Sequence, residues 1–512
     1  MSDVITVGLR DNVNLEIACE IDQAFELKEY FSCYATNYKF NPKFKAKMWN
    51  GKISFFNIHD KTLPIGLLAY LKPFLKKFKY KIRFEFDRTK LKNEITSEDL
   101  TSFHNVLFDG VKNNGKPVYP RDYQHEAILS ALQHKRGVLE AATGAGKSII
   151  IYSIIRFIME HVKGKVLLVV PSINLVSQMF SDFREYGWWD NYDDVSLLYG
   201  TSKNYDPKKK VLISTWQSIH KKGQKFFEQF DAVLVDETHN AKSTSIQTVL
   251  KKCVNAEYKL GMTGTLPTEQ IDRFNIFGYL GPVIYKLRSH ELISRGFLSD
   301  IRIINTYLRY TSAEVSANRK RKYAEEISFI TKNEKRNKVL KHIISSKNVK
   351  ESENILILAQ RLNHIDSIEK YLKDEYPNRT VLKISGVTNP EERERIRQYV
   401  ECNDSVILVA TYGTLSTGVN IPKLHHVIFA SFYKSKIKVL QSIGRGLRLH
   451  KSKKIIYIWD IIDDMRWKKK KRKNSTEEYG YNYAFKHFLE RKVFYSEQRF
   501  KSIDMRLKLE EL

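Results

Sequence analysis

A short segment between positions 142 and 148 combines the residue types that hold a phosphate chain. It reads Ala142-Thr143-Gly144-Ala145-Gly146-Lys147-Ser148. Glycines let backbone N–H groups approach phosphate oxygens, a lysine neutralises the β- and γ-phosphates, and a serine hydroxyl can ligate Mg²⁺. Ala141 stands where the strict form of this loop has glycine, but apolar residues flank the segment on both sides, as a strand–loop–helix unit requires. The segment predicts a site for ATP and Mg²⁺ lined by Thr143, Gly144, Ala145, Gly146, Lys147 and Ser148.

A pair of carboxylates follows an apolar run further along the chain. Asp236 and Glu237 come directly after residues 232–235. Alone, such a pair would usually cap a helix. After a buried strand beside a phosphate-binding loop, one carboxylate can hold Mg²⁺ and its neighbour can polarise the attacking water. We therefore expect Asp236 and Ser148 to be the metal ligands and Glu237 to be catalytic.

Two arginines near the end of the chain complete the candidate chemistry. Arg445 and Arg448 lie in the segment 441–448, which reads QSIGRGLR. Their spacing puts them on one helix face, and guanidinium groups neutralise charge on a transferring phosphoryl group. Read alone, the segment would be an unremarkable basic helix start. Together with the phosphate-binding loop, it predicts an arginine finger presented across a cleft between two domains.

The elements that must position these residues follow an α/β pattern. From about residue 116, short apolar runs alternate with helical stretches, which is typical of parallel sheets. The pattern lapses in the polar stretch near 312–321 and then resumes. We therefore expect an α/β protein with two tandem parallel-sheet domains over 116–311 and 326–467. A connector over 312–325 would join these domains, and a basic tail with a helix would occupy 468–512.

The first 115 residues predict a small α+β domain of their own. Within it, Lys39, Lys43, Lys45 and Lys47 alternate with aromatic residues. Lysines can neutralise phosphates while aromatic rings stack on bases or pack inward. The alternative is a strand whose lysines form a solvated face. Because the last three lysines lie two apart, an extended backbone would point them to one side, with Phe44 on the other.

The overall charge favours a polyanionic partner. Lys and Arg number 86 against 58 Asp and Glu, which leaves a formal charge of +28. Nucleic acid is the first candidate and an anionic membrane surface the second. The apolar stretch 149–159 is interrupted by Ser153 and Arg156 and is shorter than the ~20 residues of a membrane span. No secretory signal is recognisable at the start of the sequence. We therefore expect a cytoplasmic protein that binds nucleic acid and has no membrane partner.

The order and spacing of these motifs resemble those of superfamily 2 helicases over about 117–467. The segment 120–124 resembles the adenine-reading Q motif, 263–265 resembles motif III, and 416–420 resembles motif V. The resemblance implies two RecA-like domains around ATP. It implies further nucleotide contacts from Arg121, Gln124, Gly418 and Asn420. It also implies strand contacts from Pro171, Ser172, Thr215, Trp216, Gln217, Gln360, Arg361 and Thr411.

A closer resemblance extends into the first domain. The segments 38–44, 49–53, 63–67 and 459–464 are similar to those of phage helicases of the UvsW type. The resemblance implies an ATP-dependent DNA helicase or translocase of recombination, repair and replication. Its substrates would be branched or double-stranded DNA, namely Holliday junctions, forks and R-loops, with RNA contacted where an R-loop contains it.

Three alternatives stay open on the sequence alone. An RNA-directed superfamily 2 helicase would share the motifs that grip a sugar–phosphate backbone. The motor part of a restriction-type nuclease would also share them, but the first 115 residues show no convincing nuclease constellation of carboxylates and lysine. A binding protein with a decayed ATPase is disfavoured because Lys147, Asp236, Glu237, Arg445 and Arg448 are all present.

Overall fold

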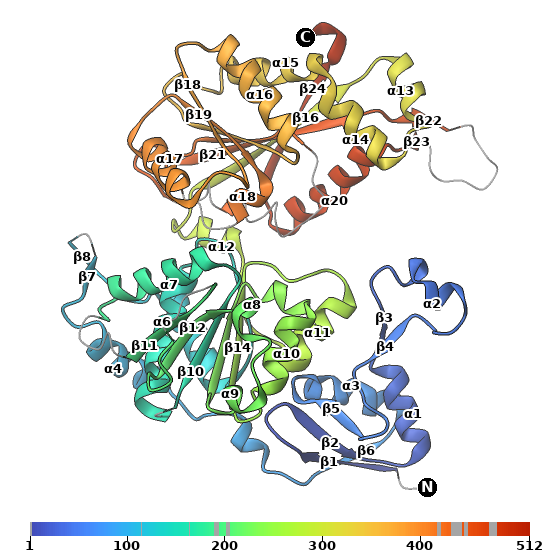
Figure 1. Cartoon of the computed structure of the whole chain (residues 1–512), viewed down its shortest axis with the longest axis vertical. Helices are drawn as coiled ribbons and strands as arrows, with labels where there is room; N and C mark the ends of the chain where they lie inside the picture. The colour runs from blue at the N-terminus through green and yellow to red at the C-terminus, as the bar shows by residue number, and fades with distance from the viewer. Residues whose placement is uncertain are drawn as a thin grey trace. The chain divides into compact units, whose positions relative to one another are not determined.

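The computed structural model describes residues 3–113, 115–162, 164–188, 194–200, 205–416, 421–431, 443–444, 449–469 and 479–512. Its contacts divide the chain into two compact units, Met1–Leu287 and Arg288–Leu512. Figure 1 shows the elements of each unit. No helix within these described ranges is long and apolar enough to cross a bilayer.

The first unit begins with a small mixed domain. Its sheet has the order β5-β2-β1-β6, in which β1 runs antiparallel to β2 and parallel to β6. Fully buried side chains such as Leu15, Leu27 and Phe74 join this sheet and two helices into one core. A separate hairpin, β3–β4, carries the short helix α2. The elements are β1 (Val4–Leu9), β2 (Asn14–Ala18), α1 (Ile21–Tyr30), β3 (Ser32–Tyr34), α2 (Pro42–Lys45), β4 (Lys52–Ser54), β5 (Thr62–Pro64), α3 (Leu68–Phe78) and β6 (Lys81–Phe84).

The rest of the first unit is built on a parallel sheet of seven described strands, in the order β11-β12-β10-β13-β14-β9-β15. Strands such as β10 are buried at every position, which explains their unbroken apolar sequence. The strands are β9 (Arg136–Ala141), β10 (Val166–Val170), β11 (Val195–Leu198), β12 (Val211–Thr215), β13 (Ala232–Asp236), β14 (Tyr258–Thr263) and β15 (Val283–Leu287). The helices are α4 (Ser97–Leu107), α5 (Asp122–His134), α6 (Lys147–Phe157), α7 (Ile173–Glu185), α8 (Trp216–Ile219), α9 (Gln224–Glu228), α10 (Thr244–Lys252) and α11 (Gln270–Leu280).

The second unit is built on another parallel sheet of seven described strands, ordered β18-β19-β17-β20-β21-β16-β24. Its strands are β16 (Asp300–Arg309), β17 (Ile355–Ala359), β18 (Thr380–Ile384), β19 (Val406–Thr411), β20 (His426–Phe429), β21 (Ile455–Asp464) and β24 (Lys501–Lys508). A small hairpin pairs β22 (Trp467–Lys468) with β23 (Tyr479–Gly480). The helices are α12 (Ser289–Ser294), α13 (Ser312–Asn318), α14 (Tyr323–Lys332), α15 (Glu334–Ile344), α16 (Leu362–Glu375), α17 (Pro390–Cys402), α18 (Tyr412–Ser416) and α20 (Tyr483–Glu497).

These sheets confirm the predicted α/β class with two tandem parallel-sheet domains. The expected boundaries differ from the observed division. The second unit starts at Arg288, not after residue 311, because β16 is hydrogen-bonded between β21 and β24 of the second sheet. The stretch 312–325 is not an irregular connector, since α13 begins there with a capping box from Thr311 and Glu314.

The expected tail is also part of the second domain. Helix α20 is present as predicted, but β24 then pairs in parallel with β16 along the edge of the sheet. Arg491 of α20 forms two hydrogen bonds with Asp460 of β21, and both side chains are buried. A buried bidentate ion pair of this kind fixes the helix against the sheet.

Candidate nucleotide and DNA site

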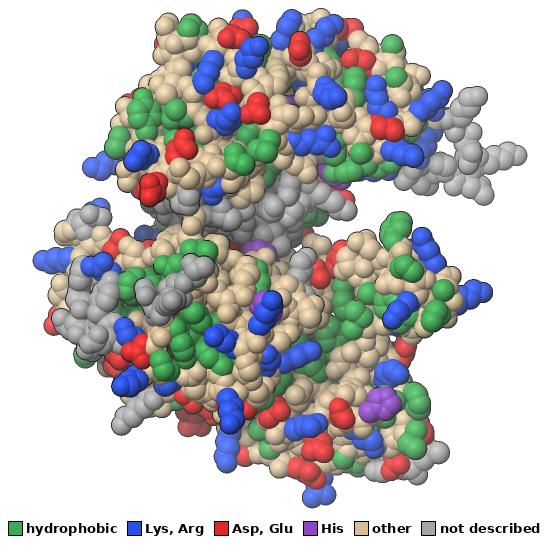
Figure 2. Space-filling model, in the orientation of Figure 1, with side chains coloured by type: hydrophobic (Ala, Val, Ile, Leu, Met, Phe, Trp, Pro, Cys, Tyr) green, Lys and Arg blue, Asp and Glu red, His purple; other side chains and the backbone are tan. Residues whose placement is uncertain are grey.

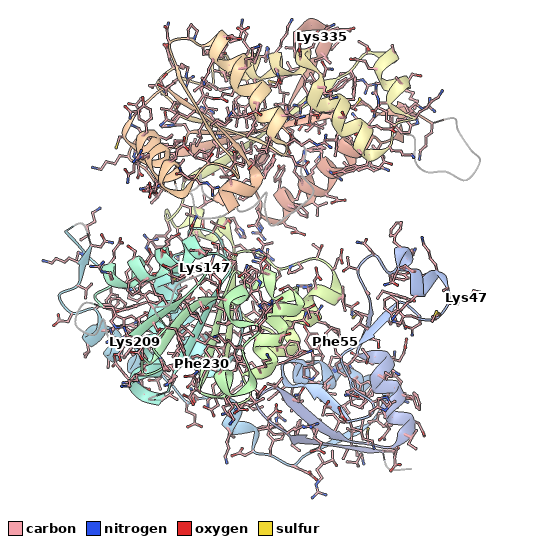
Figure 3. The ribbon with its side chains drawn as sticks, viewed as in Figure 1. Lys47, Phe55, Lys147, Lys209, Phe230 and Lys335 are labelled. Carbon is pink, nitrogen blue, oxygen red and sulfur yellow. The ribbon has the colours of Figure 1, made fainter. Side chains whose placement is uncertain are left out.

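The phosphate-binding loop lies between β9 and α6, as the sequence predicts. Gly144 and Gly146 have φ angles of 89° and 75°, a region that favours glycine. At Gly146 a Cβ would stand 2.4 Å from Nε2 of Gln124, so a side chain there would also displace the Gln124 amide. Lys147 and Ser148 open α6. Figure 3 shows Lys147 beside the strands of the first sheet.

Gln124 packs directly against this loop. Its Nε2 donates a 2.8 Å hydrogen bond to the carbonyl of Ala145, and its Oε1 accepts one of 2.8 Å from the Arg121 backbone N–H. The side chain is buried. The structure therefore brings together the Q-motif segment and the phosphate-binding loop that the sequence assigns to one site.

Asp236 ends β13 and is buried beside the loop. Its Oδ1 has no hydrogen-bond partner among the described residues. Burial, together with the charge of the neighbouring Glu237 carboxylate, raises the pKa of Asp236 to about 6, and the charge of Lys147 opposes this shift. A buried carboxylate oxygen without a partner, close enough to feel the charge of Lys147, suits a divalent cation bound together with phosphates.

The donor set fits Mg²⁺ better than a closed metal site. No group of three or more His, Cys, Asp or Glu side chains with metal-binding geometry occurs in the part of the chain that the structure describes. Mg²⁺ commonly uses one or two protein ligands together with water and substrate phosphates. Asp236 and Ser148 could supply those protein ligands. The Ser148 hydroxyl lies 2.8 Å from the hydroxyl of Tyr186, a residue that the sequence did not single out.

A chain of contacts joins the carboxylate pair to the next strand. Glu237 has a φ of 49°, and its carboxylate lies 3.2 Å from Nδ1 of His239. The same His239 nitrogen lies 3.3 Å from Oγ1 of Thr263 at the end of β14. Gly264 then faces the loop, since a Cβ there would stand 3.2 Å from Oγ1 of Thr143. The ends of β13 and β14 and the phosphate-binding loop thus touch one another.

The expected strand-contacting residues of the first unit lie at the carboxyl ends of adjacent strands. Val170 and Thr215 are paired at the ends of β10 and β12, and Pro171, Ser172, Trp216 and Gln217 follow them. Nε2 of Gln217 lies 3.5 Å from the carbonyl of Pro171. The Ser172 hydroxyl is enclosed without a hydrogen-bond partner among the described residues. The structure therefore brings all five predicted strand-contacting residues of this unit to one edge of the sheet: Pro171, Ser172, Thr215, Trp216 and Gln217.

The corresponding residues of the second unit also gather at strand ends. Ala359 of β17 pairs with Thr411 of β19. Gln360 follows, with its backbone N–H donating to the Ser431 hydroxyl at 3.3 Å, and Arg361 occupies the N-cap position of α16. Gly418, Asn420, Arg445 and Arg448 lie outside the described residues, so their predicted roles stay predictions.

Known proteins resemble this chain in both sequence and structure. The chain matches the models for the DNA helicase UvsW N-terminal domain over residues 4–85, the type III restriction enzyme res subunit over 118–268, and the helicase conserved C-terminal domain over 334–450. It is 31% identical to the ATP-dependent DNA helicase uvsW of Enterobacteria phage T4, over 97% of this chain and 98% of that protein. The chain belongs to the UvsW family of superfamily 2 DNA helicases.

A further relative and two solved structures are also similar to this chain. The DNA 3'-5' translocase XPB2 of Sulfurisphaera tokodaii is 24% identical over 64% of this chain and 78% of that protein. The crystal structure of T4 UvsW aligns over 99% of this chain and all of that one, with a TM-score of 0.53 and 31% identity. A fragment of a putative HsdR subunit from Vibrio vulnificus shares the fold. It is 18% identical and aligns over 88% of this chain and 85% of that one, with a TM-score of 0.57.

Membership of the UvsW family confirms the predicted class of ATP-dependent DNA helicase and the two RecA-like domains. It does not favour the restriction-motor, RNA-directed or inactive alternatives. The match over residues 4–85 also supports the small first domain as part of the family's architecture.

The UvsW-type first domain packs closely against α11 of the motor domain. Gly66 lies so close to α11 that a Cβ there would stand 1.9 Å from the carbonyl oxygen of Phe277. The ring of Phe274 packs edge-on against Phe55 and Tyr70, with centroids 5.6 and 5.2 Å apart. Backbone contact together with aromatic packing leaves little freedom between these parts of the first unit.

The lysine segment of this domain forms a projecting arm on the β3–β4 hairpin, which we define as residues 32–54. The expected extended backbone is wrong here. Asn41 accepts a hydrogen bond from the Lys43 N–H, and Pro42 occupies the first turn, so α2 forms instead. Lys47 then has a φ of 57°. The alternating spacing therefore does not place the three lysines on one side.

The lysines of the arm are nevertheless exposed. Lys39, Lys43, Lys45 and Lys47 all lie on its surface, and Figure 3 shows Lys47 at its outer tip. Several aromatic rings hold the arm together, since Tyr38 stacks on Tyr34 at 4.5 Å and meets Phe44 edge-on at 4.9 Å. Phe40 and Met48 are 75% and 78% exposed. The arm thus presents cations and apolar side chains together.

Proposed function

We propose that this chain uses ATP hydrolysis to unwind or branch-migrate branched DNA, such as Holliday junctions, forks and R-loops, during recombination, repair and replication. The observation that carries the proposal is the 31% identity to a phage ATP-dependent DNA helicase over nearly the full length of both proteins. Because the similarity includes the first domain, it extends beyond the motor that many helicases share.

Lys147 binds the β- and γ-phosphates of ATP, and the backbone N–H groups of residues 143–148 surround the phosphate chain. Ser148 and Asp236 hold Mg²⁺, which when bound neutralises charge on the phosphates. Glu237 orients the attacking water, and Arg121 and Gln124 contact the adenine. Arg445 and Arg448 act as the arginine finger, and Gly418 and Asn420 complete the nucleotide contacts. The fit of Asp236 rests on its buried, unpartnered Oδ1.

The DNA strand contacts the carboxyl edges of the two sheets. Pro171, Ser172, Thr215, Trp216 and Gln217 provide the contacts of the first unit. Gln360, Arg361 and Thr411 provide those of the second unit. Hydrolysis moves one set relative to the other, because each set belongs to a different domain.

Branch migration suits such a motor energetically. Each base pair broken ahead of the junction is replaced by one formed behind it, so stacking energies of ~1.4 kcal/mol per step nearly cancel. The motor then has to bias direction more than to melt duplex. A domain that recognises the branch matters more than a large separation wedge. The arm, with exposed Lys39, Lys43, Lys45 and Lys47, is our candidate for contacting the DNA backbone.

Steady-state ATP hydrolysis on different DNAs tests this function. Wild-type protein should hydrolyse ATP faster with forked or four-way-junction DNA than with blunt linear duplex of equal length. RNA duplex should stimulate least. Equal stimulation by every duplex would overturn the branch preference, and stimulation by RNA alone would overturn the DNA assignment. The cytoplasmic location stays a prediction that localisation of a tagged protein can check.

A further inference from the structure

A strongly basic corner of the second unit lies at the carboxyl ends of β16 and β21, which β20 separates from β17 and β19 in the sheet. It is formed by α13 and by the β22–β23 hairpin, which Figure 1 shows next to each other. A cavity of about 540 Å³ opens between them. Its chemically distinctive lining comprises Arg309, Arg319, Arg466, Trp467, Lys468 and Tyr479. We call this set the hairpin patch.

The cations of the hairpin patch outnumber the carboxylates that could neutralise them. Asp464 lies at its base, 2.8 Å from Arg466 and 3.4 Å from Arg309. This buried carboxylate holds two guanidinium groups in place and cancels one of the four positive charges. Within the described ranges, no carboxylate forms an ion pair with Arg319 or Lys468. The patch therefore keeps a net positive charge facing solvent, and Figure 2 shows blue side chains over this region.

The arginine at the rim is pre-positioned by an aromatic ring. The guanidinium of Arg319 lies over Trp467, 5.3 Å from the ring centroid. Trp467 is itself packed on Gly480 across the hairpin, where a Cβ would stand 2.2 Å from the indole Cε2. Stacking orients a guanidinium without using its N–H donors. Those donors are thus available to an anionic oxygen at little cost in side-chain entropy.

We infer that the hairpin patch is a second nucleic-acid site, which binds the phosphodiester backbone of the DNA on which the motor acts. Arg319 and Lys468 supply the phosphate contacts, Trp467 orients Arg319, and Asp464 fixes Arg309 and Arg466 behind them. The sequence continues from Lys468 into further basic residues, so charge complementarity favours a polyanion over a protein partner. The inference rests on the proposed DNA-directed function, but it concerns a surface outside the helicase motifs.

The test is the equilibrium binding of full-length protein to labelled forked DNA at several salt concentrations, without nucleotide. Arg319→Gln combined with Lys468→Gln should weaken binding severalfold. The slope of log affinity against log salt should fall by about 1.8, which is ~0.9 for each of the two phosphates that are no longer neutralised. Arg319→Lys combined with Lys468→Arg retains both charges and should restore most of the slope.

A charge-matched control separates a site from a general decrease in positive charge. Lys335 and Lys338 are exposed on α15, where Figure 3 shows Lys335. Replacing both with Gln also removes two charges and should leave the slope within error of wild type. An equal effect from both double variants would overturn the site. The site would also be overturned if the protein with Arg319→Gln and Lys468→Gln lost binding of tripolyphosphate but kept the wild-type DNA affinity and salt slope.

The outcomes also distinguish this inference from the proposed function. If wild-type protein migrates junctions but the patch variants bind DNA normally, the site is wrong and the function stands. If wild-type protein shows no branch preference but the patch variants lose the salt slope, the site stands and the function is wrong.

Discussion

Gln124 and Ala145 are joined by a 2.8 Å hydrogen bond from the side-chain Nε2 to the backbone carbonyl. The same amide accepts from the N–H of Arg121, so the start of α5 and the phosphate-binding loop hold each other in place. A contact between the Q-motif segment and the loop backbone makes loop geometry depend on a residue far outside the loop sequence.

Gln124→Ala should therefore affect both stability and nucleotide binding. Removing a buried donor leaves the Ala145 carbonyl without its partner, which costs about 1–3 kcal/mol of unfolding free energy. We also expect ATP affinity to fall about tenfold, equivalent to ~1.4 kcal/mol. Gln133→Ala is the matched control. Gln133 belongs to the same helix and donates a 2.7 Å hydrogen bond to the Ile95 carbonyl, which is not part of the loop. If both variants weaken ATP binding equally, the specific link is wrong.

Asp236 should make stability depend on pH in a defined direction. Its pKa is raised from 3.8 to about 6 by burial and by Glu237, so the folded protein binds this proton more tightly than the unfolded chain does. Burying the charged carboxylate therefore costs stability above about pH 6, and this cost fades as the pH falls through 6 toward 4. In metal-free protein, Asp236→Asn should unfold at a higher temperature than wild type at pH 8, and the difference should shrink at pH 5.

Thermal unfolding at the two pH values measures this effect. Asp109→Asn, which changes an exposed aspartate of the same unit, is the control and should show no comparable trend. A gain for Asp236→Asn that grows as the pH falls would contradict the assigned environment of this carboxylate.

The contact between the first domain and α11 should not tolerate a side chain at Gly66. With a Cβ 1.9 Å from the Phe277 carbonyl, Gly66→Ala must push backbone against backbone. We expect a loss of ~1–3 kcal/mol and faster proteolysis between the two domains. Gly223→Ala is the control, since nothing lies within 4 Å of a Cβ there. Calorimetry and limited proteolysis check both variants, and wild-type behaviour of Gly66→Ala would refute the tight contact.

Much of the fold was predictable because buried parallel strands leave unbroken apolar runs. The apolar run 232–235 forms most of β13, and the loop at 142–148 followed from its glycines and lysine. The capping signals Asn41-Pro42 and Thr311…Glu314 were also in the sequence. The expectations of an extended lysine segment and of an irregular connector rested instead on lysine spacing and on polarity, which are weaker indicators of backbone conformation.

Other features required the folded chain. Strand β24 pairs with β16, almost 200 positions earlier, and no local pattern specifies such a partner. The contacts of Tyr186 with Ser148 and of His239 with Thr263 are tertiary in the same way. Burial of Asp236 could be expected from its strand, but its unpartnered Oδ1 could not.

The arm should contribute measurably to DNA binding. Lys43, Lys45 and Lys47 are exposed, so replacing all three with Ala should cost little stability. Fork affinity should fall, and the salt slope should decrease by up to ~0.9 for each phosphate that the arm no longer neutralises. This variant is preferable to deletion of the first domain, which would expose Phe274 and the backbone of α11. Unchanged affinity and slope would mean that the arm does not contact the DNA backbone.

The most direct test of an ATP-driven motor for branched DNA is single-turnover migration of a four-way junction by wild type and by Lys147→Ala. Wild-type protein with ATP and Mg²⁺ should convert the junction into its product duplexes faster than it separates a blunt linear duplex. Lys147→Ala should abolish ATP hydrolysis and migration while retaining junction affinity, because Lys147 contacts phosphates of the nucleotide and not the strand. Lys208→Ala, an exposed lysine of the same unit, is the control and should behave as wild type. Migration by Lys147→Ala, or separation of linear duplex as fast as junction migration by wild type, would contradict such a motor.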